Sequence, residues 1–323
     1  MLGQAPLVDA CQGKIIAAHT IPRSQLAKIA PDSHVYAVAG TLADLARNDG
    51  NLTAKLYGIR NFSVLNCFCA GHDDQVFSHI ENDELTFDTH QLTLLQYRSL
   101  ASELYRKVTA YHTILHQIDE QKRKKPKNKD FLEFLMAHAA GTLAGVGDVG
   151  TAFDECAKNL FAAKYDEVSA LVVHFKKLPS IMTVGGFLAQ FDYSGKRIQL
   201  ISDLHTIAEI ACFNILAASD HAALVILWPK EENAVGKKLA DSFVSKDSST
   251  YTALAVQTAF EYLENTCMNK QWWDGEKPII RKLLMDRMQT SANLWAERSS
   301  NCLTFGGVGF DQWDYERHEF VNV

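Results

Sequence analysis

Residues 66–77, NCFCAGHDDQVF, concentrate side chains that could bind a metal or transfer protons. Cys69 and His72 are separated by a short Ala-Gly spacer, and a tight turn over that spacer aims both side chains to one side. Zinc prefers four tetrahedral ligands, and thiolates and imidazoles commonly supply them as two closely spaced pairs. The spacing therefore predicts one half of a structural zinc site.

A second pair of ligands must come from elsewhere in the chain. Cys11 and His19 flank the segment QGKIIAA, which is long enough to form a small hairpin that returns the histidine beside the cysteine. Cys67 and His34 are substitutes for one of the four positions. The alternative, in which these residues are buried thiols and hydrogen-bonded histidines, stays open. The predicted ligands of a structural Zn²⁺ are Cys11, His19, Cys69 and His72.

The segment CQGKIIAAHTIPRSQL resembles the opening of HNH-type treble-clef proteins, in which a later Cys-x2-Cys or Cys-x2-His turn completes a structural zinc site. The chain is also similar to uncharacterised bacterial proteins that combine a C…AHT start with FCxxHDxxxFxxIE and YRxLxxELY. Here these motifs occupy Phe68–Glu81 and Tyr97–Tyr105. The resemblance covers roughly the first third of the chain. It implies a zinc-stabilised N-terminal module and a role in a bacterial defence or nucleic-acid-linked system, but no assigned activity.

A metal-dependent HNH-like nuclease is the alternative function. In that case His19 acts as general base, and Asp73 helps to hold Mg²⁺ or Mn²⁺. Further candidate ligands of the divalent metal are His72, Asp74, His79, Glu81 and Asn82. The alternative has two weaknesses. A histidine that serves as the base is not free to bind zinc, and the nuclease helix signature is not clean after Cys69.

The composition is that of a globular protein. Hydrophobic residues make up 47% of the chain and charged residues 22%, and a net charge of −6 argues against general coating of nucleic acid. No apolar run reaches the ~18 residues of a membrane span, and the first residues lack the pattern of a secretory signal. The seven cysteines are odd in number and scattered, which favours reduced thiols or metal ligands. A cytoplasmic protein without a membrane segment is expected.

The pattern divides the chain into three segments. Residues 1–87 are rich in turns and short apolar pieces, and a treble-clef-like zinc module is expected there. Residues 88–165 are expected to form a helical hairpin that begins with an N-cap at Asp88 or Thr89. Its basic linker, 122–129, is expected to be exposed and is a candidate contact for nucleic acid or an acidic partner. The glycines between Gly141 and Gly150 predict a loop between two helices rather than a phosphate-binding loop.

Residues 166–323 are expected to form an α+β domain. Segments rich in β-branched residues predict a small antiparallel sheet with a tight turn at Ser194-Gly195, and the pattern then returns to helices. The expected fold class is therefore α+β: a loop-rich zinc-stapled N-terminal module, long amphipathic helices, a small antiparallel sheet and a helical C-terminal end.

One side chain is expected to join the first two segments. Arg98, on the long helix, can reach back to Asp73 or Glu81. Together these features favour a zinc-stabilised cytoplasmic protein that binds or assembles with a protein partner or with a second copy of itself.

Overall fold

The computed structural model describes residues 13–38, 47–124, 128–201, 206–232, 234–292 and 298–323, and it has the expected α+β class. The helices are α1 (Arg23–Ile29), α3 (Ala70–Glu81), α4 (Thr89–Arg123), α5 (Lys129–Phe161), α6 (Val235–Val244), α7 (Tyr251–Tyr262), α8 (Lys270–Gly275) and α9 (Pro278–Ala292), with short 3₁₀ turns at Tyr165–Glu167 and Ser248–Thr250. The strands are β1 (Ala18–His19), β2 (His34–Ala37), β3 (Lys55–Gly58), β4 (Val64–Leu65), β5 (Val168–Phe175), β6 (Ile181–Phe187), β7 (Ala211–Ala218), β8 (His221–Pro229), β9 (Thr266–Asn269) and β10 (Tyr315–Val321).

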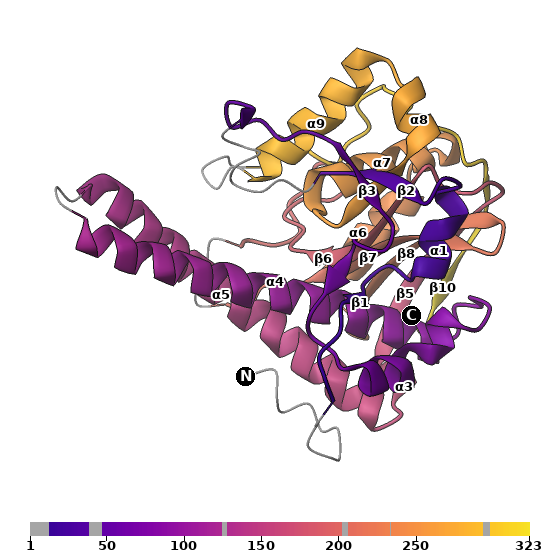
Figure 1. Cartoon of the computed structure of the whole chain (residues 1–323). Coiled ribbons are helices and arrows are strands. Elements are labelled where there is room, and N and C mark those ends of the chain that lie inside the picture. The colour runs from indigo at the N-terminus through magenta and orange to yellow at the C-terminus, as the bar shows by residue number, and fades with distance from the viewer. Residues whose placement is uncertain (1–12, 39–46, 125–127, 202–205, 233, 293–297) are drawn as a thin grey trace.

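Eight of these strands form one antiparallel sheet in the order β10-β5-β8-β7-β6-β9-β2-β3. Strands β2 and β3 come from the N-terminal segment, and β10 comes from the C-terminal end of the chain (Figure 1). The pairing of Val35 with Asn269 joins segments that were expected to belong to separate modules. The sheet is therefore a shared structure to which the first and the third segments both contribute.

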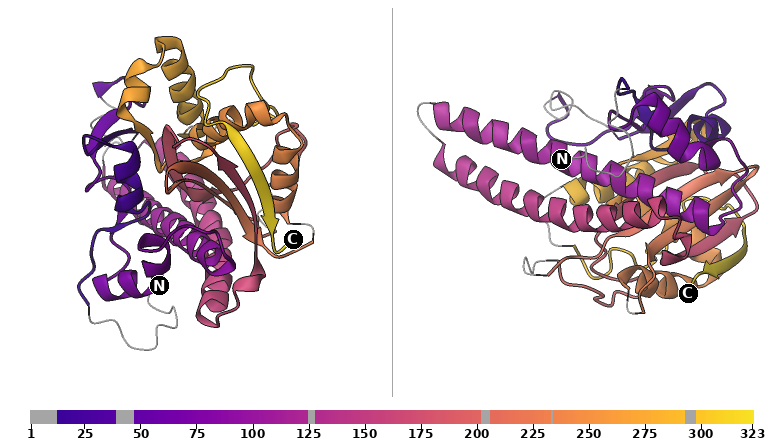
Figure 2. Two further views of the ribbon diagram at one scale, coloured as in Figure 1. Left: turned by 90° about the vertical axis from the view of Figure 1, so that its right-hand side faces the viewer. Right: turned by 90° about the horizontal axis from the view of Figure 1, so that it is seen from below.

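The central strands are buried on both faces. Every residue of β5, β6 and β7 is buried, which explains their nearly continuous apolar sequences. Alternate residues face two different cores: Val172 packs in the core under α4 and α5, and its neighbour Leu171 packs in the core under α6 and α7. Figure 2 shows the sheet between these two layers of helices.

Helices α4 and α5 form a long hairpin that crosses the sheet and continues past it (Figures 1 and 2). Asp88 caps α4 by accepting the backbone N–H of Gln91 at 2.9 Å, as expected, and Asn128 caps α5 in the same way. The projecting part has a small core of its own, built from Ile114, Ile118, Leu135 and Ala139. We call the part of the hairpin that carries this core the arm.

The glycine-rich stretch of α5 differs from expectation. The loop predicted between Gly141 and Gly150 is wrong, because α5 runs as one helix through this stretch. Glycine weakens a helix interior by roughly 1 kcal/mol each. Packing against α4 offsets this cost: the position of Gly145 lies against the Lys107 side chain, and that of Gly150 lies against Leu104. Tertiary contact therefore overrides local propensity here.

The predicted turn at Ser194-Gly195 is confirmed. Asp192 accepts the backbone N–H groups of Ser194 at 2.7 Å and of Lys196 at 2.9 Å. Gly195 has a φ of +79°, a left-handed conformation that favours glycine. None of the helices in the described ranges is both long and apolar enough to cross a membrane.

Candidate functional site

The Cys69-His72 pair lies at the start of α3. Cys69 is the N-cap residue and is buried, and its Sγ accepts the backbone N–H of His72 at 3.5 Å. Both side chains therefore come from the first turn of the helix. The positive end of the helix dipole lies at this position, and the thiolate is the form of cysteine that binds metals.

Strand β1 places His19 close to this turn. Ile15, just before the strand, forms a β-bridge with Cys69, and His19 pairs with Val64 of β4. His19 Nε2 lies 3.0 Å from the carbonyl oxygen of Ile59. Because a carbonyl only accepts, Nε2 carries the hydrogen, and Nδ1 of the neutral ring is an acceptor. A ring held in this way can bind a metal or take up a proton through Nδ1.

Asp73 follows this pair in α3 and has an incompletely satisfied carboxyl group. Its Oδ1 is buried and makes no hydrogen bond to any described residue. Burial raises the pKa of the carboxyl, and the positive charges of Arg98 and His19 oppose that rise. A buried oxygen without a donor is unusual in native proteins and marks a place where a cation, a proton or a water molecule is favoured.

Arg98 connects α3 of the N-terminal segment to α4, as the sequence predicted. The side chain is buried, its Nη2 donates to Glu81 Oε1 at 2.5 Å, and its guanidinium carbon lies 3.9 Å from the centre of the Phe77 ring. The contact to Glu81 confirms one of the two expected partners, and Asp73 is close enough to act on the pKa of Arg98. The charge is therefore buried, paired and stacked on an aromatic ring.

The remaining predicted ligands are placed as follows. Cys67 is half-buried, and burial raises its pKa to about 12, so the metal-free thiol stays protonated. His34 lies in β2, with its Nδ1 2.9 Å from the carbonyl oxygen of Asp32. Within the described part of the chain, no three His, Cys, Asp or Glu side chains are grouped so that they could hold a metal. Cys11 lies outside the described residues, so the four-ligand zinc site stays a prediction.

The candidate ligands beyond Asp73 separate along α3. His79 and Glu81 suit one face of a strand, but the segment is helical, and residues two apart on a helix point to different sides. His79 contacts Asp83 at 2.5 Å and stacks on His90 with ring centres 4.9 Å apart. Glu81 is held by Arg98. These contacts separate His79 and Glu81 from the divalent site of the nuclease alternative, which leaves His19, His72, Asp73 and the neighbouring Asp74.

Comparisons with protein-family models, with curated proteins and with solved structures found no match to this chain. The residue geometry is thus the basis for assigning a function.

A second candidate site lies where the hairpin leaves the sheet. It is a cavity of about 600 Å³ between α4, α5, β6 and the end of α7. We call it the hairpin cavity. The lining residues on which the argument depends are Glu103, Arg106, Lys107, Phe134, His138 and Tyr262.

The floor of the hairpin cavity is a gap in the sheet. Strand β9 pairs with β6 only as far as Thr183, so the following residues of β6 lack a neighbouring strand on that side. Glu103 fills part of the gap by accepting the backbone N–H of Gly186. A Cβ on Gly185 would come within 3.0 Å of Glu103 Oε1, so the glycine is what lets the carboxylate approach the strand.

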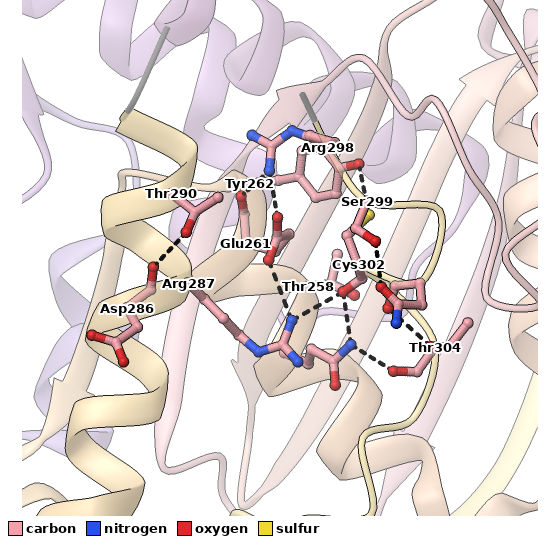
Figure 3. A network of polar contacts seen from close by, with 12 residues as sticks. Thr258, Glu261, Tyr262, Asp286, Arg287, Thr290, Arg298, Ser299, Cys302 and Thr304 are labelled. Atoms are coloured by element: carbon pink, nitrogen blue, oxygen red, sulfur yellow. Dashed lines mark hydrogen bonds and ion pairs between the residues drawn. The ribbon is translucent and has the colours of Figure 1, made fainter. Parts of the chain in front are cut away.

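Tyr262 and Arg298 form part of one wall of the cavity. Arg298 is held by the buried carboxylate of Glu261, and Figure 3 shows the contacts of that carboxylate. Glu261 accepts hydrogen bonds from Arg287 at 3.2 Å and from Arg298 at 2.6 Å. The Arg298 guanidinium lies 4.0 Å from the centre of the Tyr262 ring. That ring also stacks on Phe187 with ring centres 4.3 Å apart, and its hydroxyl lies 3.5 Å from Cys302 Sγ. Several contacts therefore hold this wall in place, and Glu261 shares its single negative charge between Arg287 and Arg298.

Sequence reasoning did not single out the hairpin cavity. Arg106 and Lys107 look like ordinary surface residues of an amphipathic helix, and His138 looks like one of many polar residues on the next helix. The one local signal is the Gly185-Gly186 pair inside a β-branched segment, because glycine in a strand often marks a close approach by another group.

Proposed function

We propose that this chain is a zinc-stabilised binding and assembly protein whose arm docks a partner protein. The observation that carries the proposal is the arm itself, which extends past the sheet with a separate small core (Figure 1). A hairpin that only covered the sheet would end where the sheet ends. The extra length costs conformational entropy and leaves apolar surface in water, and a docked partner would offset both costs.

The chemistry of the arm indicates the kind of partner. Leu115, Met136 and Leu143 are 36%, 54% and 50% exposed, and the last two lie seven residues apart, on one face of α5. The described residues at the arm's tip include four basic ones, Lys122, Arg123 and Lys124 at the end of α4 and Lys129 at the start of α5, in a chain of net charge −6. Residues 125–127 of the basic linker lie outside the described residues. An apolar face next to a basic tip fits a partner that offers an apolar groove bordered by acidic side chains.

Site-specific photo-crosslinking tests the docking proposal. A photoreactive residue at Met136 or Leu143 is expected to capture a protein in the cells that produce the chain, whereas one at Ile279, which is 67% exposed on α9, is not. Replacing Lys122 and Lys124 by Glu should reduce the yield of the adduct at least about tenfold, because the acidic rim is then repelled. Equal adduct yields from Met136 and Ile279 would exclude the arm as the docking surface. An adduct yield that does not change on charge reversal would exclude it as well. Mass spectrometry of the adduct distinguishes a different protein from a second copy.

The zinc part of the proposal rests on the first turn of α3. Cys69 and His72 share that turn, and His19 Nδ1 is an acceptor on the adjacent strand. A bound cation would also compensate the unpartnered Oδ1 of Asp73, either directly or through a ligand. We propose that Cys11 completes the ligand set and that the metal stabilises the short β1–β4 sheet.

Elemental analysis tests the metal. Protein purified without chelator is expected to contain about one zinc per chain, and the variants Cys69→Ser and His72→Ala are expected to lose most of it. His116→Ala is the matched control, because that histidine is 74% exposed on the arm. Protein without zinc, or a His72 variant that keeps it, contradicts the zinc proposal.

A metal-dependent nuclease is the second candidate, and the tautomer of His19 favours it. With Nε2 bonded to the Ile59 carbonyl, Nδ1 is available as a general base near Asp73. Under this alternative, His19→Ala abolishes cleavage of DNA or RNA in Mg²⁺ or Mn²⁺ while the protein stays folded. If the wild type cleaves neither nucleic acid, the nuclease alternative is wrong.

A further inference from the structure

The hairpin cavity holds cationic groups that the protein itself satisfies poorly. Arg106 has its nearest carboxylate, Glu264, at 3.8 Å, and Glu264 is 78% exposed. The Nε of Arg106 is buried and makes no hydrogen bond to a described residue. An arginine normally uses its planar set of donors on a close acceptor, so this one lacks the strong partner that its position allows.

Lys107 lies next to Arg106 and adds a second positive charge to the lining. Its stem passes over Gly145 of α5, where the ammonium nitrogen is 3.4 Å from the position that a Cβ would occupy. A larger residue at position 145 would displace it. The close approach of the two helices therefore holds the ammonium group near the cavity.

Glu103 does not cancel these charges in the way that a surface carboxylate would. Burial raises the pKa of its carboxyl, although Arg106 and Lys107 oppose the rise, and one oxygen already accepts the N–H of Gly186. Such a carboxyl is better suited to a hydrogen bond with a ligand than to a tight ion pair with the lysine or the arginine.

The lining also includes two aromatic rings from α5. Phe134 and His138 are four residues apart on α5, with ring centres 5.8 Å apart, and both border the cavity. Burial lowers the pKa of His138, so its ring is neutral at physiological pH. The cavity therefore offers both aromatic rings and cations to a ligand.

We propose that the hairpin cavity binds a small organic anion with a ring, whose phosphate or carboxylate is held by Arg106 and Lys107 and whose ring lies against Phe134 and His138. The volume of about 600 Å³ accommodates a molecule as large as a mononucleotide. Glu103 then forms a hydrogen bond to a polar group on the ring. This site shares no residue with the predicted zinc ligands or with the exposed face of the arm.

Calorimetric titration of the full chain with paired probes tests this site. Adenosine monophosphate and indole-3-acetate supply a phosphate and a carboxylate on a ring, and adenosine and indole are their uncharged counterparts. At least one anionic probe is expected to bind with a Kd below about 1 mM, and at least about tenfold more tightly than its counterpart. Preference between the two anionic probes identifies the anionic group. If neither anionic probe binds saturably up to about 10 mM, the proposal is wrong.

Substitutions then locate the binding. Arg106→Gln and Lys107→Gln are each expected to weaken binding of the anionic probe about tenfold or more, because each removes a charged contact. Lys282→Gln, an exposed change on α9 that removes the same charge, should leave the affinity unchanged. Thermal unfolding checks that the variants fold, and Lys107→Gln decides the question if Arg106→Gln is unstable. Unchanged affinity in a folded Lys107 variant would overturn the proposal.

Discussion

Arg98 is the residue that ties the N-terminal segment to α4. Replacing it by alanine removes the 2.5 Å contact to Glu81 and the contact to the Phe77 ring, and it leaves two partly buried carboxylates without their cation. Breaking one partner of a buried charge pair commonly costs about 3–5 kcal/mol. Arg98→Ala is therefore expected to lower the free energy of unfolding by several kcal/mol, measured by urea denaturation.

Arg317 provides the matched control for that experiment. It also pairs with a glutamate, Glu319, at 3.0 Å, but its side chain is 56% exposed. Exposed ion pairs contribute about 0–1 kcal/mol, so Arg317→Ala should change stability little. Similar losses of unfolding free energy in the two variants would show that Arg98 does not hold the N-terminal segment to α4 in the way its contacts indicate.

His174 gives the stability a pH dependence of known sign. It is buried in β5, its Nε2 lies 3.0 Å from Glu319 Oε1, and Arg317 and His221 are the other charged or titratable groups that act on it. Burial lowers the pKa of His174 below the ordinary value of about 6.5, although Glu319 opposes this. The unfolded chain therefore binds the proton more readily. Stability from the neutral ring is present above about pH 6.5 and is lost as the pH falls through the folded-state pKa.

The variant His174→Gln tests this dependence. Between pH 7 and about pH 5.5 it is expected to lose less stability than the wild type, by at most about 1.4 kcal/mol per pH unit for one proton. Urea denaturation at several pH values measures the slope, and His116→Gln, a change at a 74% exposed histidine, should follow the wild type. A His174 variant with the wild-type slope would mean that this ring does not control the acid response.

At the scale of elements, two glycines in helices are predicted to respond oppositely to alanine. A Cβ on Gly236, in the first turn of α6, would lie 2.3 Å from the Cβ of the buried Trp228. Gly236→Ala should therefore cost about 1–3 kcal/mol through overpacking. Gly147 lies inside α5 with no atom within 4 Å of the same position, so Gly147→Ala should stabilise by about 0.5–1 kcal/mol. Thermal unfolding compares them, and a destabilised Gly147 variant would contradict a continuous α5.

The elements that could be predicted from the sequence are those with a local signature. The Asp88 cap and the apolar spacing after it predicted α4, and opposite charges within reach predicted the Arg98–Glu81 pair. The loop expected near Gly147 was wrong because glycine propensity is weak beside packing against α4.

The parts that could not be predicted depend on partners far away in the chain. Strand β2 pairs with β9 through Val35 and Asn269, and neither short segment identifies the other. The hairpin cavity also depends on distant segments. Arg106 borders a cavity because β9 stops pairing with β6 at Thr183 and leaves a gap there. The sequence therefore predicted that Cys69 and His72 lie together, which is a local feature, and their role as metal ligands stays a prediction. The sequence did not predict the cavity, which is assembled from α4, α5, β6 and α7.

At the scale of the whole molecule, the sheet requires strands from both ends of the chain. A fragment of residues 166–323 would keep β5 to β10, but it would lose β2 and the helices that cover Val172, Val184 and Val225. Burial of such apolar surface is the main favourable contribution to folding. The fragment is therefore expected to expose one face of its sheet and to lack a single fixed packing.

This expectation is tested by comparing the fragment with a cleaved but complete chain. A protease site inserted between Lys124 and Asn128 cuts the connection of α4 to α5 and removes no segment that packs on the sheet. The cleaved chain should keep its near-ultraviolet circular dichroism and unfold cooperatively, because both pieces stay held by the shared core. The 166–323 fragment should lose that signal, bind a hydrophobic dye and unfold without a sharp transition. A cooperatively folded fragment would instead mean that the C-terminal part is an independent domain on which β2, β3 and the hairpin are additions.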